Sequence, residues 1–140
     1  MKINFENLSN YNPSIIAETA CGHDGNYKKL TRLIDIAKKS GATAIKFQIY
    51  KLNERANKNT KEEKIFKSLL LSNKEWFEAV KLAHKKKLFV FADIFGVESF
   101  KLAICVFLSD YFKSIKQTFW FFSGSLIGFF KFCKGDNEFC

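Results

Sequence analysis

A chain of 140 residues with 47% hydrophobic and 26% charged residues has a globular composition, which excludes an intrinsically disordered protein. The formal charge of +9 suits an anionic small substrate, but no nucleic-acid-binding motif accompanies it, so nucleic acid is not an expected partner. The four cysteines form no CxxC pair and no zinc spacing, and residues 1–12 show no secretory signal, which predicts free thiols in a cytoplasmic protein.

In chain order, the sequence divides into a flexible lead-in over 1–12, an α/β region over 13–104 and an atypical tail over 105–140. Strands are predicted at 14–18, 42–48 and 88–93, and helices at 27–40, at 61–71, from near 73 to the lysines at 85–87, and at 97–103. The polar stretch 49–59 is expected to be a loop. Alternating strands and helices favour a parallel sheet.

Local signals support two of the helices. Apolar residues recur at helical spacing between residues 30 and 37, and Gly41 follows where a left-handed cap residue is expected. Ser72 and Glu75 form the pattern of a capping box, which predicts a helix that starts near Asn73.

Polar side chains stand at the carboxyl ends of the three predicted strands. Glu18 ends the first, Lys46 and Gln48 end the second, and Asp93 ends the third. Because the carboxyl ends of neighbouring parallel strands open onto one face, these side chains are expected to lie together. Two interpretations stay open. Glu18 and Lys46 form a structural ion pair, or they belong to a cationic site that binds a phosphate or carboxylate.

His23, in a glycine-flanked loop, is more typical of a hydrogen-bonded structural element than of a catalyst.

The tail has a different character. Residues 105–140 are rich in phenylalanine, carry three of the four cysteines and show no persistent helical or strand period. The apolar run 118–130 spans about 13 residues, fewer than the ~20 that a membrane-spanning helix needs. A segment at a membrane surface is an alternative interpretation.

Residues 13–103 resemble the N-terminal barrel part of the sialic acid synthases, the family of the N-acetylneuraminate, legionaminic and pseudaminic acid synthases. The resemblance is carried in order by the segments 15–18, 22–25, 33–37, 41–48, 89–95 and 98–103. The sequence departs from the family at Gly22, where asparagine is more common. It departs again over 92–95, where many members carry a serine or threonine that helps to bind phosphoenolpyruvate.

The resemblance implies a fold and a reaction. The fold is a partial (β/α)8 TIM barrel, namely its first three βα units, followed by an irregular aromatic-rich C-terminal tail. The reaction condenses phosphoenolpyruvate with an N-acetylated amino sugar to a nonulosonic acid and releases phosphate. The family is homodimeric and uses a divalent metal, Mn²⁺ or Mg²⁺, whose ligands lie in later strands and are therefore expected to be absent from this chain.

The resemblance also implies roles for individual residues. Lys46 would bind phosphoenolpyruvate, Glu18 would be the catalytic residue that lines the same pocket and orders the reactants, and Gln48 would face the sugar. The segment Asp110–Lys113 looks like the family's fourth strand, in which Lys113 would be a further contact to phosphoenolpyruvate.

A complete barrel needs about 250 residues, so the chain is expected to be a truncated and inactive fragment. Residues 105–140 have the composition that an A/T-rich gene gives when it is read out of frame, which is our hypothesis for the tail. The alternatives are a small non-enzymatic α/β module that binds anions and a membrane-associated protein that uses the aromatic tail.

Overall fold

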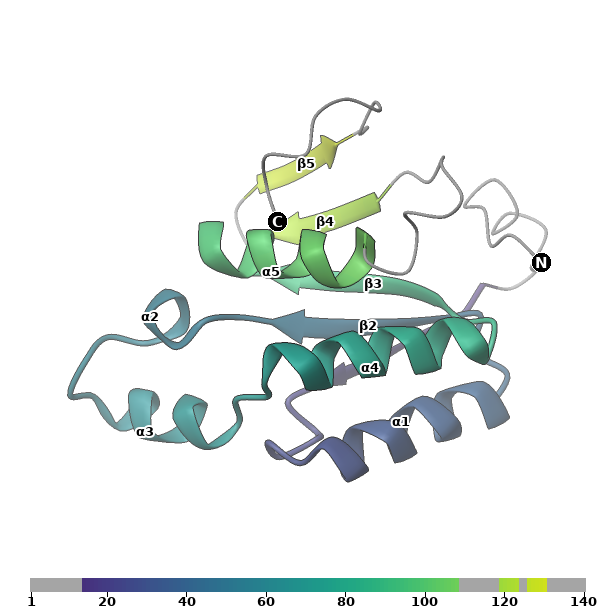
Figure 1. The fold of residues 1–140 in the computed structure, drawn as a ribbon, viewed down its shortest axis with the longest axis horizontal. Coiled ribbons are helices and arrows are strands. Elements are labelled where there is room, and N and C mark those ends of the chain that lie inside the picture. The colour runs from purple at the N-terminus through teal and green to yellow at the C-terminus, as the bar shows by residue number, and fades with distance from the viewer. Residues whose placement is uncertain (1–13, 109–118, 124–125, 131–140) are drawn as a thin grey trace.

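The computed structural model describes residues 14–108, 119–123 and 126–130 (Figure 1). The elements in chain order are β1 (Ile16–Ala20), α1 (Tyr27–Lys39), β2 (Ala44–Ile49), α2 (Leu52–Arg55), α3 (Lys61–Ser68), α4 (Asn73–Lys85), β3 (Phe89–Ile94), α5 (Val97–Leu108), β4 (Phe119–Ser123) and β5 (Leu126–Phe130). They form one sheet in the order β1-β2-β3-β4-β5. β1, β2 and β3 pair in parallel, β4 joins β3 in parallel through two residue pairs, and β5 is antiparallel to β4.

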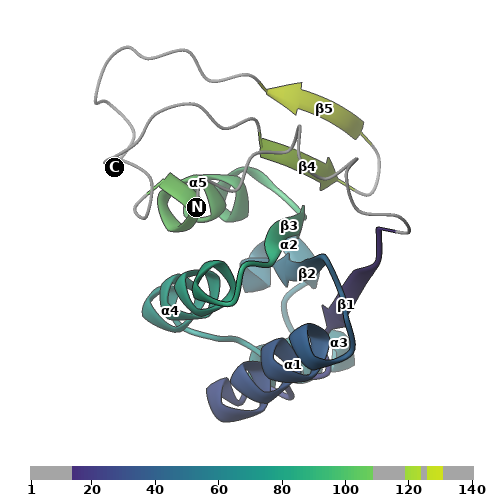
Figure 2. The same cartoon turned by 90° about the vertical axis from the view of Figure 1, so that its right-hand side faces the viewer.

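The helices α1, α4 and α5 lie on one side of the parallel strands, as Figure 2 shows. Successive side chains of a strand point to opposite faces, so every second residue of β2 and β3 meets the helices. The core between the two layers is made by Ile45, Phe47 and Ile49 of β2, Val90, Ala92 and Ile94 of β3, and Leu30, Ile34, Trp76, Ala79, Val80 and Ala83 of the helices. The intervening residues of β2, Lys46 and Gln48, therefore point away from the helices.

The helix ends follow the local signals in the sequence. The Asn26 side chain accepts hydrogen bonds from the backbone N–H groups of Lys28 and Lys29 and so caps α1. The predicted capping box between Ser72 and Glu75 is confirmed at the start of α4. Gly41, with φ of 82°, takes the left-handed conformation after α1.

The α/β class is confirmed, and the parallel strands β1, β2 and β3 within the five-stranded sheet are consistent with a partial barrel. The element boundaries differ in places. β1 covers Ile16–Ala20 rather than 14–18, α3 ends at Ser68 rather than residue 71, and the expected loop at 49–59 contains the short helix α2. α5 continues through residue 104 to Leu108.

The expectation of an irregular tail is wrong for two segments, because β4 and β5 form an antiparallel pair. Runs of aromatic and aliphatic residues on either side of Gly124-Ser125 favour strands by composition.

The predicted lead-in at 1–12, the segment Asp110–Lys113 and thus the Lys113 side chain lie outside the described residues. In the part of the chain that is described, no helix combines the length and apolar character that crossing a membrane requires.

Candidate functional site

Four polar side chains from three strands meet on one face of the sheet, between the middle and the carboxyl ends of β1, β2 and β3. Glu18 pairs in register with Lys46, and Gln48 pairs in register with Asp93. The Lys46 Nζ atom lies 3.0 Å from Glu18 Oε2 and 3.1 Å from Asp93 Oδ2. The Gln48 amide donates a hydrogen bond of 3.3 Å to Glu18 Oε1. We call this group of four the strand-end cluster. The structure thus places Glu18, Lys46 and Gln48 together, as the sequence predicts.

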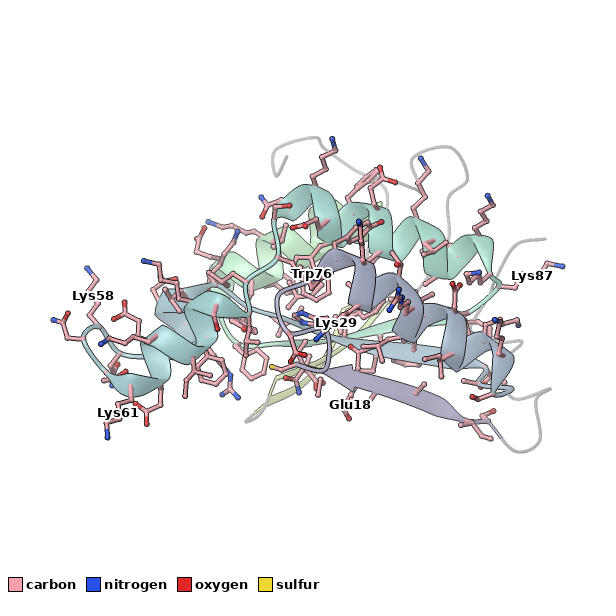
Figure 3. All side chains as sticks on the ribbon, turned by 90° about the horizontal axis from the view of Figure 1, so that it is seen from below. Glu18, Lys29, Lys58, Lys61, Trp76 and Lys87 are labelled. Atoms are coloured by element: carbon pink, nitrogen blue, oxygen red, sulfur yellow. The ribbon has the colours of Figure 1, made fainter. Side chains whose placement is uncertain are left out.

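The strand-end cluster lies on the sheet face opposite the helices. In Figure 3, Glu18 points away from the helices, whereas Trp76 lies between them and the sheet. On β2, the neighbours Ile45, Phe47 and Ile49 are fully buried in the core. Because side chains alternate along β2, Lys46 and Gln48 lie on the face opposite the helices, and the buried residues between them fix the backbone of the strand against the core.

Lys46 is held as a cation between two carboxylates. Burial alone would lower the pKa of Lys46, but the hydrogen bonds and charges of Glu18 and Asp93 outweigh it and raise that pKa above its ordinary value. An ammonium group has three N–H donors, and the two carboxylates take two of them, so within the described residues one donor is left for a ligand. The ion pair between Glu18 and Lys46 is present. Because one Lys46 donor remains, the ion pair is also compatible with the interpretation that Lys46 binds an anionic ligand.

Cys21 borders the strand-end cluster, and Tyr50 lies near Cys21; neither was assigned to a site from the sequence. The Cys21 thiol, which is free and half-buried, lies 3.9 Å from Gln48 Oε1. Burial, with a smaller contribution from the nearby Cys21, raises the pKa of Tyr50 to about 12. The only sequence signal for Cys21 is its place in the loop directly after the first predicted strand.

His23 is a buried structural residue. Its side chain is 1% exposed, and its Nδ1 accepts a hydrogen bond of 3.1 Å from the backbone N–H of Gly25. The imidazole ring meets Trp76 edge to face, with ring centroids 5.7 Å apart. Its Nε2 has no hydrogen-bond partner among the described residues. Because Nδ1 is an acceptor, the neutral ring carries its proton on Nε2. This arrangement supports the structural interpretation of His23.

Burial of His23 predicts a loss of stability in mild acid. Desolvation lowers the pKa of His23 below 6.5, and the charge of Asp24 opposes this only in part. A group with a lowered folded-state pKa stabilises the fold above the unfolded-state value and loses that contribution as the pH falls. We expect the free energy of unfolding to drop by up to about 1.4 kcal/mol per pH unit below about pH 6.5. Urea denaturation between pH 5 and pH 8 measures this slope, and it should flatten in His23→Gln. Parallel curves for both proteins would show that another group titrates.

The divalent metal that the resemblance implies finds no ligand set in the described residues. No group of three or more histidine, cysteine, aspartate or glutamate side chains there is arranged to hold an ion. Glu18 and Asp93 are the carboxylates nearest to such a role, but the Lys46 ammonium stands between them and balances their charge. These residues therefore do not fit the metal, and we assign it no ligand.

An excursion of the chain between β2 and α4, residues 52–68, forms an arm beyond the carboxyl ends of β2 and β3 (Figure 1). Glu54 of α2 accepts hydrogen bonds from the backbone N–H groups of Glu98, at 2.6 Å, and Ser99, at 3.0 Å, and so caps α5. The Arg55 guanidinium lies between two aromatic rings, 4.5 Å from the centroid of Phe66 and 4.6 Å from that of Phe95. The arm is thus fastened to the β3–α5 connection, and Figure 3 shows Lys58 and Lys61 at its far end.

Comparison with known proteins gives partial matches. No family model matches the chain. An uncharacterized protein of Methanocaldococcus jannaschii is 41% identical over 71 residues, which are 51% of this chain and 21% of that protein. The crystal structure of an N-acetylneuraminic acid (sialic acid) synthetase from Leptospira borgpetersenii, in complex with citrate, is 32% identical with a TM-score of 0.61, over 66% of this chain and 32% of that one. A spore coat polysaccharide biosynthesis protein from Bacillus subtilis is 21% identical with a TM-score of 0.48, over 69% of this chain and 26% of that one.

Parallel strands covered by helices on one face, with polar side chains gathered on the other between the middle and the carboxyl ends of the strands, are consistent with part of a barrel enzyme's site. Within that class, the solved structure to which the chain is similar at 32% identity is a sialic acid synthetase. The chain is related to the sialic acid synthases, as its sequence predicts. It spans about a fifth of the length of the curated protein and about a third of that of the solved synthetase.

Proposed function

We propose that the strand-end cluster forms part of the site of a sugar acid synthase, in which Lys46 binds phosphoenolpyruvate. The observation that carries this proposal is the position of the Lys46 ammonium on the helix-free face of β2, between two carboxylates and with a hydrogen-bond donor left for a ligand among the described residues. A lysine is a compact cation that offsets the charge of an anionic substrate in a partly desolvated cleft. The relationship to the synthetase supports phosphoenolpyruvate as that anion.

In the proposed reaction, the methylene carbon of phosphoenolpyruvate attacks the aldehyde carbon of an N-acetylated amino sugar and a C–C bond forms. Water adds to C2 of the former phosphoenolpyruvate, the bond from C2 to the phosphate oxygen breaks, and inorganic phosphate leaves. Glu18, whose side chain is 43% exposed, is the group able to contact the incoming reactants and order them. Gln48, hydrogen-bonded to Glu18, would present its amide to the sugar. Lys113 would add a further contact to phosphoenolpyruvate.

We further propose that these 140 residues alone bind phosphoenolpyruvate without turning it over. The chain spans about a third of the solved synthetase, and a complete barrel needs about 250 residues. Incubation with phosphoenolpyruvate, N-acetylmannosamine and Mn²⁺, followed by a phosphate assay, should show no release above the rate without protein. Sustained release of phosphate together with the nonulosonic acid would contradict this proposal.

The substitution Lys46→Ala tests the binding site. We expect it to weaken phosphoenolpyruvate binding at least tenfold, measured by NMR titration of the ¹⁵N-labelled chain, because the site loses its cation. Lys86→Ala is the matched control, since Lys86 forms an ion pair with Asp35 on the helical side of the molecule. Binding that survives in Lys46→Ala, or falls equally in Lys86→Ala, would contradict the proposal.

Selectivity separates the enzyme-derived site from a simple anion-binding module. A substrate site prefers phosphoenolpyruvate to inorganic phosphate or citrate at the same ionic strength, because it recognises the shape of the molecule as well as its charge. Equal affinity for the three anions, still dependent on Lys46, would favour the non-enzymatic module.

A further inference from the structure

We propose that Asp93 is a specificity-determining residue of the strand-end cluster. Asp93 holds the Lys46 ammonium in place and restricts the access of multiply charged anions to that ammonium. This inference rests on the proposed function, since it concerns the same lysine, and it assigns different roles to the two carboxylates that contact Lys46. Asp93 is the fixed partner of Lys46, and Glu18 is the partner that an incoming anion displaces.

The two carboxylates differ in how firmly the protein holds them. The Asp93 side chain is 20% exposed, and β3 continues past it to the buried Ile94. Asp93 also sits in an unbroken parallel register with β2, opposite Gln48. Glu18 is 43% exposed and lies where the register between β1 and β2 becomes irregular, between residues 18 and 20. Because Glu18 is already well solvated, it can leave Lys46 and turn into water at a smaller free-energy cost than the less exposed Asp93.

The charge of the strand-end cluster works against anions. Two carboxylates face one ammonium, so the cluster carries one net negative charge when all three groups are ionised. A phosphate dianion that reaches the third Lys46 donor must approach Asp93 as well, and like charges at such distances in a partly buried site repel each other. A group with a single charge, or a neutral oxygen, meets less repulsion. Asp93 thereby sets which part of a ligand Lys46 accepts.

Two substitutions that each remove one negative charge from the cluster separate the roles. The full 140-residue chain, with Asp93→Asn or with Glu18→Gln, is titrated with inorganic phosphate and with phosphoenolpyruvate by NMR. We expect Asp93→Asn to bind both anions at least fivefold more tightly than the original chain. Glu18→Gln should gain less, because Glu18 already turns into water when an anion binds. Asp35→Asn makes the same change of total charge on the helical side and should leave both affinities unaltered.

A second measurement tests the contact itself. The pKa of Lys46, followed through its ¹³Cε resonance, should fall in Asp93→Asn because one of the two carboxylates that raise it is gone. The proposal is overturned if Asp93→Asn binds phosphate no more tightly than the original chain, if Asp35→Asn matches its gain, or if the Lys46 pKa does not move. The proposed function fails by a different result, namely that the original chain does not bind phosphoenolpyruvate through Lys46, whatever the ratio between the variants.

Discussion

Replacing Gly25 by alanine is expected to lower the free energy of unfolding by about 3 kcal/mol or more, among the largest effects of any single substitution in this chain. Gly25 has φ of 64°, in the left-handed region that disfavours residues with a Cβ. A Cβ at this position would also overlap the backbone carbonyl oxygen of Ser68 at the end of α3. Backbone atoms cannot turn aside as a flexible side chain can, so the loop after β1 and the arm would have to separate.

Gly41 provides the control that isolates this contact. Its φ of 82° carries a similar conformational cost, but a Cβ there would meet nothing within 4 Å. Gly41→Ala should therefore cost only the backbone strain, about 1–2 kcal/mol. Urea denaturation of both variants, followed by far-ultraviolet circular dichroism, measures the difference. If Gly25→Ala loses no more stability than Gly41→Ala, the packing of the loop against Ser68 contributes little.

The contact at Gly25 also shows why the arm could not be predicted from the sequence. The four residues of α2 have no strong helical pattern, and the helix is held by Glu54, whose acceptors bind backbone groups 44 and 45 residues later in the chain. A Cβ at Gly96 would overlap the Glu54 carboxylate and push that side chain from its position. Tertiary partners of this kind leave no periodic signal. By contrast, α1 and α4 depend on local caps and helical spacing, and both were predicted nearly to the residue.

The candidate site was predictable to the extent that it follows from strand geometry. Parallel strands and the two-residue pleat place Glu18, Lys46 and Gln48 together without further information. The sequence could not show that Asp93 contacts Lys46 directly, because that depends on the register between β2 and β3. The predicted first strand also stopped at Glu18, whereas β1 continues to Ala20. Within this extension, the Thr19 hydroxyl donates a hydrogen bond to the Lys46 backbone carbonyl.

Replacing Trp76 by alanine is expected to cost about 3–5 kcal/mol, as for other large aromatic residues in cores. The Trp76 side chain is 3% exposed and packs against the Phe47 ring, with centroids 5.7 Å apart, and against His23. It therefore joins three parts of the molecule, which are α4, the strand that carries Lys46 and the loop after β1. The alanine variant leaves a cavity where these parts meet. Trp76→Phe keeps a ring there and should lose clearly less stability.

Ile36→Ala is the matched control for Trp76→Ala, because Ile36 lies on α1 but is 57% exposed and should change stability by at most about 0.5 kcal/mol. Denaturation midpoints at pH 7.5 rank the three variants, and equal losses in Trp76→Ala and Ile36→Ala would contradict the packing of Trp76 in the core.

The pH dependence of the free energy of unfolding gives an independent check. Water that enters the cavity solvates the imidazole, so the pKa of His23 returns toward its ordinary value and the loss of stability below about pH 6.5 becomes shallower in Trp76→Ala.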